Sequence, residues 1–322
     1  MATLRVMAAA TAIAFLGACA NPAPSSFVPS AGSGLVQSGR TAPAVQSAGG
    51  RRVLYIANLG GSQPGVGSIL VYTASMTNPQ LIRTISNGTG RPIGLWVDSK
   101  NDLWVANQYD KYPDNVTAFK PGASSPFFTI PDTSFVGYPG SVAVDAHGNV
   151  WTNESDEDEG YVQEFGPGKT SANLTLDTGV GGYAFDPGSL AFDPQGNLYA
   201  AESAKLQTQI VELARGSKQF VPVNLDLNGN NVNGTGMGID KAGNIYVASS
   251  EAGTIAVFPP GQSEPSRTIS PVEAYGLTWV TGDGAVYQSS GESDVYEIAP
   301  GASSPTYTLG CECQTLGVAV SR

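Results

Sequence analysis

The sequence has few charged side chains, and few positively charged ones in particular. Asp, Glu, Lys and Arg make up 13% of the 322 residues, about half the share in an ordinary globular protein. The 16 Lys and Arg residues are outnumbered by 27 Asp and Glu residues, which gives a formal net charge of −11. No segment gathers Lys and Arg into a basic stripe. We therefore expect no nucleic-acid partner and no direct attraction of the polypeptide to anionic lipid.

Histidine is almost absent, since His147 is the only one. A histidine pair that holds zinc on a helix is therefore excluded. The sequence also lacks a Gly-x-Ser-x-Gly nucleophile motif before a helix and a Gly-x-x-x-x-Gly-Lys-Ser/Thr phosphate loop. Any general base other than His147 would have to be a carboxylate or a tyrosine.

Apolar runs long enough to span a membrane are missing as well. The run from Val6 to Leu16, which follows Arg5, is too short to cross a bilayer stably. It ends in Leu16-Gly17-Ala18-Cys19, which resembles the lipobox of bacterial lipoproteins. That resemblance implies that residues 1–18 are a signal peptide and that Cys19 carries the lipid of an exported protein of the bacterial cell envelope. An ordinary cleaved signal peptide that contains a cysteine is the alternative.

The residues after Cys19 predict which membrane holds the protein and how the folded domain is connected to it. Ala20 stands where an Asp retains some lipoproteins in the inner membrane, which favours the outer membrane. Residues 19–50 are rich in Ala, Ser, Pro and Gly and cannot bury enough apolar surface to offset the entropy of ordering. We therefore expect a disordered tether over 19–50 and a folded domain over 51–322.

Only two further cysteines are present, Cys311 and Cys313. A pair separated by one residue closes a strained ring if it is oxidised, and it supplies half of the thiolates that a structural zinc site needs. A loop pair without function and a redox or soft-metal role are both compatible with this spacing.

What the sequence does contain is a repeat. Each copy has a small-residue start, a hydrophobic strand that ends in Asp, a Gly-Asn turn and a second strand with an aromatic residue. Four clear copies are Pro92–Asn107, Pro139–Glu154, Pro187–Glu202 and Gly234–Ser249. The aromatic residue stands at Tyr55, Trp104, Trp151, Tyr199, Tyr246 and Tyr287, in steps of 49, 47, 48, 47 and 41 residues. Periods of this length indicate a repeat architecture.

The repeat predicts an all-β fold, a six-bladed β-propeller of four-stranded antiparallel blades. In the second copy, four strand-like segments are bounded by turn residues: Gly94–Val97, Leu103–Ala106, Val116–Phe119 and Phe127–Ile130. Four strands in 40–50 residues is the period of a propeller blade. The first unit, residues 53–85, lacks its own first strand, and Leu316–Ser321 is a first strand with nothing after it. We expect the C-terminal strand to pair into the first blade and close the ring.

The repeat resembles NHL-repeat and SMP-30/gluconolactonase-like six-bladed propellers over about residues 51–322. The resemblance rests on the pattern Gly, three hydrophobic residues, Asp-x-x-Gly-Asn and a Tyr or Trp two residues later. It implies the fold but no single activity, because these families include enzymes, ligand-binding modules and scaffolds. The metal-binding positions of gluconolactonase-like relatives are occupied here by Ile93, Pro139, Pro187, Thr235, Tyr275 and Thr315. No such ligand set remains.

Virginiamycin B lyase, another propeller, is similar at Trp151-Thr-Asn-Glu154. That family needs a histidine base near its magnesium ion. His147 lies in the turn between the first two strands of its blade, at the opposite rim from the expected site. A lyase of this type would therefore lack a histidine base at the expected site.

We place any binding site on the rim with the variable connections, because variable loops on a rigid scaffold usually carry binding. Polar residues three positions after each strand-two aromatic form a ring there: Asn58, Asn107, Glu154, Glu202, Ser249 and Ser290. These residues either hold the loops by hydrogen bonds or contact a ligand, and Glu154 and Glu202 are the candidates for a calcium or magnesium ion. The acidic run from Glu154 to Glu159 is a solvated loop or a loop around such a cation. Tyr109, Tyr183 and Tyr275 either stack on a sugar or peptide or pack within loops.

Two functions remain after these exclusions. The first is a non-catalytic, lipid-anchored envelope module, a monomer without a resident cofactor, that binds a protein, peptide, glycan or cation on its variable rim. The alternative is a metal-assisted lyase or hydrolase with Glu154 and Glu202 as metal ligands or base.

Overall fold

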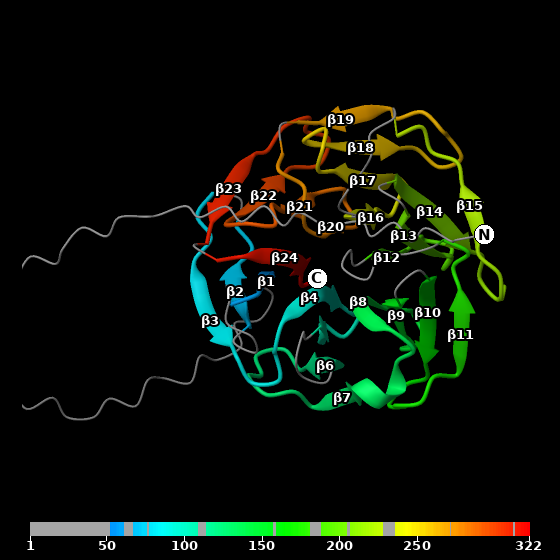
Figure 1. Ribbon diagram of the computed structural model, residues 1–322. Coiled ribbons are helices and arrows are strands. Elements are labelled where there is room, and N and C mark those ends of the chain that lie inside the picture. The colour runs from blue at the N-terminus through cyan, green and yellow to red at the C-terminus, as the bar shows by residue number, and fades with distance from the viewer. Residues whose placement is uncertain are drawn as a thin grey trace, which may run out of the picture. The chain divides into compact units, whose positions relative to one another are not determined.

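The computed structural model describes residues 52–60, 67–75, 77–108, 114–156, 159–180, 188–204, 207–227, 236–270, 272–311 and 313–322. These residues form six four-stranded antiparallel sheets arranged in a ring, a β-propeller (Figure 1). The predicted fold class and blade number are therefore confirmed. No helix among these residues has the length and apolar character of a membrane span.

The blades are numbered here along the chain, and their strands are given from the ring axis outwards. Blade 1 contains β24 (Thr315–Val320), β1 (Val53–Asn58), β2 (Ser68–Thr73) and β3 (Leu81–Ile85). Blade 2 contains β4 (Pro92–Val97), β5 (Leu103–Asn107), β6 (Asn115–Phe119) and β7 (Phe128–Pro131). Blade 3 follows the 3-10 turn η1 (Asp132–Ser134) and contains β8 (Tyr138–Val144), β9 (Val150–Asp156), β10 (Glu159–Phe165) and β11 (Leu174–Asp177).

The remaining three blades follow the same order. Blade 4 contains β12 (Ser189–Phe192), β13 (Leu198–Ala204), β14 (Gln207–Leu213) and β15 (Val221–Val223). Blade 5 contains β16 (Met237–Ile239), β17 (Ile245–Ser249), β18 (Thr254–Phe258) and β19 (Arg267–Ile269). Blade 6 contains β20 (Thr278–Val280), β21 (Val286–Ser289), β22 (Asp294–Ile298) and β23 (Tyr307–Gly310).

The C-terminal strand closes the ring, as predicted. In Figure 1, β24 lies next to β1 near the ring axis, and the two strands pair antiparallel with Tyr55 opposite Ala319. Ser321 fixes the end of this pairing, because the N–H of Val53 donates to its Oγ and its own N–H donates to the carbonyl of Val53. The first and last strands of the propeller thus share one sheet.

The hydrophobic core lies between neighbouring blades. Successive side chains of a strand point to opposite faces, so a strand sandwiched between two blades must be apolar throughout. In β1, Tyr55 packs with Leu95 of blade 2 on one face. On the other face Leu54 and Ile56 pack with Val295 of blade 6. This two-sided burial explains why the second strand of each unit reads as a continuous hydrophobic run.

The turn between the first and second strands is built around the Asp of the repeat. Oδ1 of Asp98 accepts hydrogen bonds from the N–H groups of Lys100 and Asp102, and its Oδ2 accepts from Trp104 Nε1 at 3.2 Å. The same carboxylate in blade 5, Asp240, accepts from the hydroxyl of Tyr246 at 3.1 Å. The Asp and the aromatic residue therefore recur together because one clamps the other.

These turns also require a positive φ. Gly148, Gly196 and Gly243 supply it in blades 3, 4 and 5, with φ values of 85°, 88° and 83°. In blade 2 the corresponding residue is Asn101, at φ 61°. Asn is one of the few side chains that tolerates this region.

Small residues and three aromatic rings fill the centre of the ring. A Cβ added to Gly94 of β4 would lie 2.6 Å from the Cα of Ser141 in β8, so the inner strands meet closely where the repeat begins. Near the turn end of these strands, Trp96 of blade 2 contacts Trp279 of blade 6, with ring centroids 5.1 Å apart. Trp96 also contacts Phe192 of blade 4, at 6.4 Å. Side chains from alternate blades therefore meet across the axis at this end.

The propeller has two different rims. We call the rim with the turns between strands one and two and between strands three and four the turn rim. The opposite rim, with the connections between strands two and three and between blades, is the variable rim. On this rim β9 extends to Asp156 and β13 to Ala204. The expectation that the acidic run Glu154–Glu159 forms a loop is therefore wrong in part, since Glu154 pairs with Tyr161 within the blade 3 hairpin.

Candidate functional site

The predicted polar ring lies towards the variable rim, at or near the end of each second strand. Asn107, Glu154, Glu202, Ser249 and Ser290 are buried, with at most 6% of each residue exposed, and Asn58 is half-buried. Most of these side chains bond to nearby backbone. Oδ1 of Asn58 accepts from the N–H of Gly60, Ser249 Oγ from the N–H of Ala252, and Ser290 Oγ from two N–H groups of the next turn.

Asn107 holds the connection that leads into its own blade. Its Oδ1 accepts from the N–H of Gly90 at 3.2 Å. Its Nδ2 donates to the side chains of Asn115 and Thr117 at 2.9 and 3.2 Å. Each polar atom of this fully buried amide therefore has a partner within the protein, which supports the loop-holding reading of this position.

Glu154 holds the equivalent connection of blade 3. Its Oε2 accepts from the N–H groups of Val136 and Gly137 at 2.9 and 3.2 Å, and its Oε1 accepts from Thr152 Oγ1 at 2.6 Å. Gln163 also donates to this carboxylate when its amide is oriented so that its oxygen accepts from Thr175 Oγ1. Burial raises the pKa of Glu154 to about 7, although these three hydrogen bonds act in the opposite direction.

Glu202 occupies the same position in blade 4 but has different surroundings. It is 3% exposed, and its Oε1 has no hydrogen-bond partner among the described residues. It reaches towards blade 3, since a Cβ on Gly160 would lie 3.3 Å from Glu202 Cδ. Burial raises the pKa of Glu202 to about 8, and the approach of the Asn153 amide offsets this only in part.

Two further polar atoms near Glu202 also lack partners. Asn153 of β9 is 3% exposed and Ser141 of β8 is 4% exposed, and the two residues are opposite each other in the sheet. The Asn153 amide faces the Glu202 carboxyl group without making a hydrogen bond of normal geometry, and Ser141 Oγ has no partner within the described part of the chain. Asn153 Nδ2 lies against the first residues of blade 4, because a Cβ on Gly188 would be 2.3 Å from it. We call Ser141, Asn153 and Glu202 the junction site between blades 3 and 4.

The junction site was found only in part from the sequence. Glu202 was predicted as a rim residue, whereas Asn153 and Ser141 were not. No sequence signal separates Glu202 from Glu154, because both stand three positions after the aromatic residue of their unit. The difference between them comes from neighbours contributed by the adjacent blade.

Glu154 and Glu202 were the candidates for a calcium or magnesium ion. Within the described ranges, no group of three His, Cys, Asp or Glu side chains could hold a metal ion. The two carboxylates have different neighbours: Glu154 accepts from N–H and O–H donors, and Glu202 Oε1 has no partner among the described residues. A calcium or magnesium site at these residues stays a prediction.

Of the three aromatic residues predicted for this rim, the structure describes only Tyr275. Tyr275 is 60% exposed, and its Cβ would be 2.6 Å from a Cβ placed on Gly291. Its backbone is thus fixed against the turn of blade 6 while its ring faces solvent. Tyr109 and Tyr183 lie outside the described residues.

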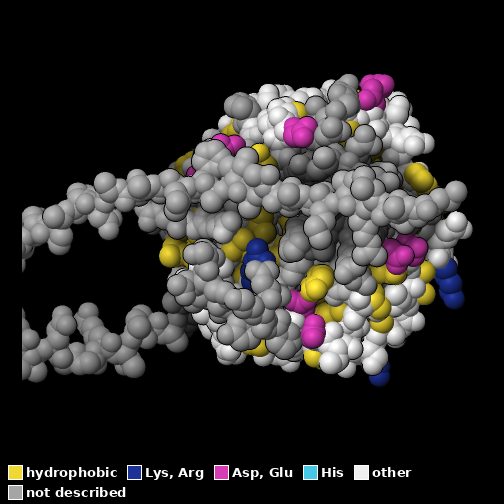
Figure 2. All heavy atoms as spheres, viewed as in Figure 1, with side chains coloured by type: hydrophobic (Ala, Val, Ile, Leu, Met, Phe, Trp, Pro, Cys, Tyr) yellow, Lys and Arg dark blue, Asp and Glu magenta, His cyan; other side chains and the backbone are white. Residues whose placement is uncertain are grey.

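In Figure 2, hydrophobic and acidic side chains are interspersed over the visible face of the molecule.

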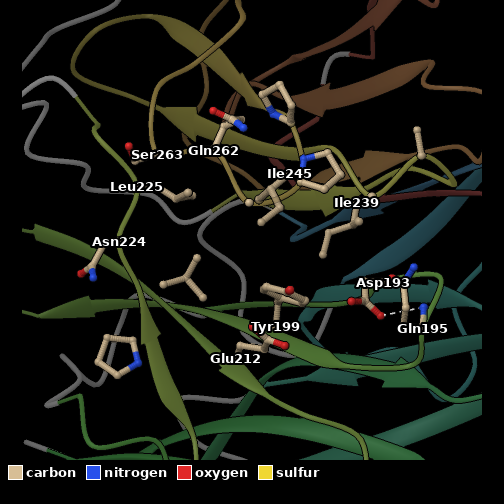
Figure 3. A pocket seen from close by; sticks show the side chains of 17 residues that line it. Asp193, Gln195, Tyr199, Glu212, Asn224, Leu225, Ile239, Ile245, Gln262 and Ser263 are labelled. Atoms are coloured by element: carbon tan, nitrogen blue, oxygen red, sulfur yellow. Dashed lines mark hydrogen bonds between the residues drawn. The ribbon is translucent and has the colours of Figure 1, made fainter.

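A cavity that sequence reasoning missed lies on the turn rim, between blades 4 and 5. Its volume is about 430 Å³, and the turns around Asp193, Ala242 and Pro260 contribute to its wall. Figure 3 shows Tyr199 and Glu212 on one side of the cavity and Ile239 and Ile245 on the other. Burial, together with the nearby Glu212 and Asp193 carboxylates, raises the pKa of Tyr199 to about 12. His147 also lies on this rim, in the predicted turn, with its Nε2 at 3.4 Å from Arg215.

Comparison with known proteins identifies the fold. A chain of the nidogen/laminin complex matches with a TM-score of 0.61 and 16% identity, over 84% of this chain and 98% of that chain. A protein of unknown function from Bacteroides caccae matches with a TM-score of 0.60 and 12% identity, over 85% and 100% of the two chains. The WD40 β-propeller domain of Doa1 matches with a TM-score of 0.55 and 12% identity, over 82% and 81%. No family model and no curated protein matches the sequence. These similarities show a propeller and do not assign an activity.

The buried carboxyl groups predict how stability depends on pH. Burial raises the pKa of Glu154, Glu202 and Glu297 to about 7, 8 and 7, so the folded state binds more protons than the unfolded state above pH 4.5. Their contribution to stability is complete below that pH and is lost as the pH rises through the folded-state values. We expect the melting temperature to fall between pH 5 and pH 8.5.

Two variants test this pH prediction. Glu202→Gln and Glu297→Gln each remove one buried ionisation, so each is expected to raise the melting temperature at pH 8.5 by about 3 °C or more and to flatten the profile. Melting curves recorded by circular dichroism across this range provide the measurement. A melting temperature of the unmodified protein that rises with pH would contradict the prediction.

Proposed function

We propose that this chain is a non-catalytic binding module that takes up a peptide segment of a protein partner at the junction site on its variable rim. The observation that carries the proposal is a set of three buried polar atoms that make no hydrogen bond to any described residue, Ser141 Oγ, Asn153 Nδ2 and Glu202 Oε1. Buried polar groups are rarely left unpaired in native proteins. Elsewhere on this rim, Asn107 and Glu154 bond within the protein.

The chemistry of the junction site suits a peptide bond. A peptide unit offers a carbonyl that accepts from Asn153 Nδ2 or Ser141 Oγ and an N–H that donates to Glu202. A peptide unit is also uncharged, so the ligand brings no additional charge into the buried site. One structural neighbour was crystallised as a nidogen/laminin complex, a complex of two proteins, and the exposed Tyr275 ring offers further contact area on the same rim. Aromatic residues are enriched in protein interfaces.

The cellular setting is part of the same proposal. We propose that the propeller is of the NHL and SMP-30-like type and that Cys19 anchors it, through lipid, to the outer membrane of a bacterial envelope. In that arrangement residues 19–50 are the tether and the propeller works as a monomer. Labelling with an alkyne fatty acid in a bacterial host tests the anchor, with Cys19→Ala as the control that is expected to lose the label.

Selection of binding peptides tests the proposed site. The full chain is immobilised and panned against a phage library of random peptides, and the enriched peptides are then titrated against variants. We expect Asn153→Ala and Glu202→Gln each to weaken binding about tenfold, because a lost hydrogen bond that leaves its partner unpaired costs about 1–3 kcal/mol. The matched control is Gln262→Ala on the turn rim, which is expected to bind normally. Equal affinity for all variants, or selective loss in Gln262→Ala, would move the binding function away from the junction site.

The alternative, a metal-assisted lyase or hydrolase, has its own test. Millimolar calcium or magnesium is expected to change the melting temperature by less than about 1 °C, because Glu154 is already filled by N–H and O–H donors. The comparison is the same protein treated with a chelator. A saturable increase of several degrees that Glu154→Gln or Glu202→Gln abolishes would favour the enzyme reading.

A further inference from the structure

We infer that Cys311 and Cys313 form a thiol–disulfide exchange site on the variable rim that accepts electrons from cationic thiols. The two cysteines are joined by a disulfide with a sequence separation of 2. Both residues are half-buried, so the sulfur atoms are within reach of a reagent in solvent. Exposed or strained disulfides are generally the labile, catalytic or regulatory ones, whereas structural disulfides resist reduction.

The position of the disulfide argues against a structural role. It lies in the connection between β23 and β24 and joins two points of that same connection. Hydrogen bonds already hold both ends of this segment, from the N–H of Cys311 to the carbonyl of Ser293 and from the N–H of Thr315 to that of Glu292. The entropic benefit of a disulfide grows with the length of the loop it closes, and this loop is among the shortest. Its removal should therefore leave the closure of the ring almost unchanged.

The surroundings determine which sulfur is attacked. The carbonyl oxygens of Ser293 and Cys313 lie 3.2 and 3.9 Å from Cys311 Sγ. These partial negative charges disfavour a thiolate on Cys311, so Cys313 is the better leaving group. An incoming thiolate attacks Cys311 Sγ, forms a mixed disulfide there and releases the Cys313 thiolate. A second thiolate then attacks the reagent's sulfur, which releases the Cys311 thiolate and the oxidised reagent. Two electrons pass from two thiols to the disulfide, and the protons of these thiols end on the two cysteines.

The charge around the disulfide selects the thiol. Glu292 is exposed, Asp294 is opposite Gly310 in the sheet, and Glu312 lies between the two cysteines in the sequence. No Lys or Arg occurs in the sequence between 268 and 321. These negative charges therefore attract cationic thiols and repel anionic thiols such as glutathione. The chemical class expected as substrate is a thiol with a neighbouring positive charge, for example a cysteine flanked by Lys or Arg.

Three small thiols of different charge test the inference on the full, oxidised chain. Cysteamine, 2-mercaptoethanol and 2-mercaptoethanesulfonate are compared at low salt, with each rate divided by the thiolate concentration. Alkylation and peptide mass mapping follow Cys311 and Cys313 separately from Cys19. We expect cysteamine to react at least tenfold faster than the sulfonate, and this ratio to fall towards one at high salt. In the double variant Glu292→Gln, Asp294→Asn the ratio is expected to fall at low salt as well.

Two further measurements separate reactivity from structure. With cystamine, Cys313→Ser is expected to form a mixed disulfide at Cys311 that remains until a further thiol is added. Reduction of the unmodified protein is expected to leave its melting temperature unchanged within about 2 °C, which corresponds to a small stability change. A disulfide that resists millimolar cysteamine for hours, equal rates for the three thiols at low salt, or a large fall in melting temperature on reduction would overturn the inference.

Discussion

A chain that ends at Gln314 is expected to lose the cooperative unfolding transition of the propeller. The deletion removes β24, in which Val318 and Val320 are each 2% exposed. Burial of a valine contributes about 1.5–3 kcal/mol, and the deletion also leaves β1 without its neighbour towards the ring axis. Against a total stability of about 5–15 kcal/mol for a typical domain, this loss is large. Circular dichroism and limited proteolysis are the measurements.

The control for this truncation is the removal of Arg322 alone. That deletion loses one exposed hydrogen bond, from the Arg322 N–H to Asn101 Oδ1 at 2.8 Å, and is expected to leave the melting curve unchanged. A truncated chain that still melts cooperatively within a few degrees of the full protein would show that the ring does not depend on its last strand.

Substitution of Gly317 by alanine is expected to lower the melting temperature by about 5–10 °C. A Cβ at this position would lie 2.2 Å from the carbonyl oxygen of Ile93, where β24 meets the inner strand of blade 2. The backbone of both strands would have to move, and overpacking of this kind costs about 1–3 kcal/mol or more. One kcal/mol corresponds to about 2–4 °C in a domain of this size.

Gly310→Ala is the matched control for Gly317→Ala. It lies in β23, the preceding strand in the sequence and the outer strand of blade 6, where an added Cβ would have only Asp294 Oδ1 within 4 Å, at an ordinary 3.6 Å. We expect its melting temperature to change by less than about 2 °C. If both alanine variants melt at the same temperature, the close approach of the inner strands is not what limits substitution at Gly317.

The fold was predictable from the sequence because each level of structure leaves a local signal. The Asp of each unit clamps an aromatic residue six positions later, as Asp98 clamps Trp104, so the spacing is fixed by one hydrogen bond. The lone strand after Thr315 could be assigned to the first unit because that unit lacked an inner strand. Repeats with one structural unit per period leave few alternatives of topology.

The candidate site was less predictable because it depends on contacts between blades. Glu154 and Glu202 are equivalent in the repeat, yet Glu154 accepts from the N–H groups of Val136 and Gly137, while Glu202 Oε1 finds no donor in the described ranges. The cavity beside Tyr199 likewise combines turns of two blades. A repeat pattern describes one unit and contains no information on how side chains of adjacent units meet.

The pairing of β24 with β1 has a consequence for biogenesis. Strands β1 and β24 belong to one sheet, so synthesis up to residue 320 must precede completion of the toroid. A nascent chain still attached to the ribosome would keep its earliest blade open and its folding incomplete.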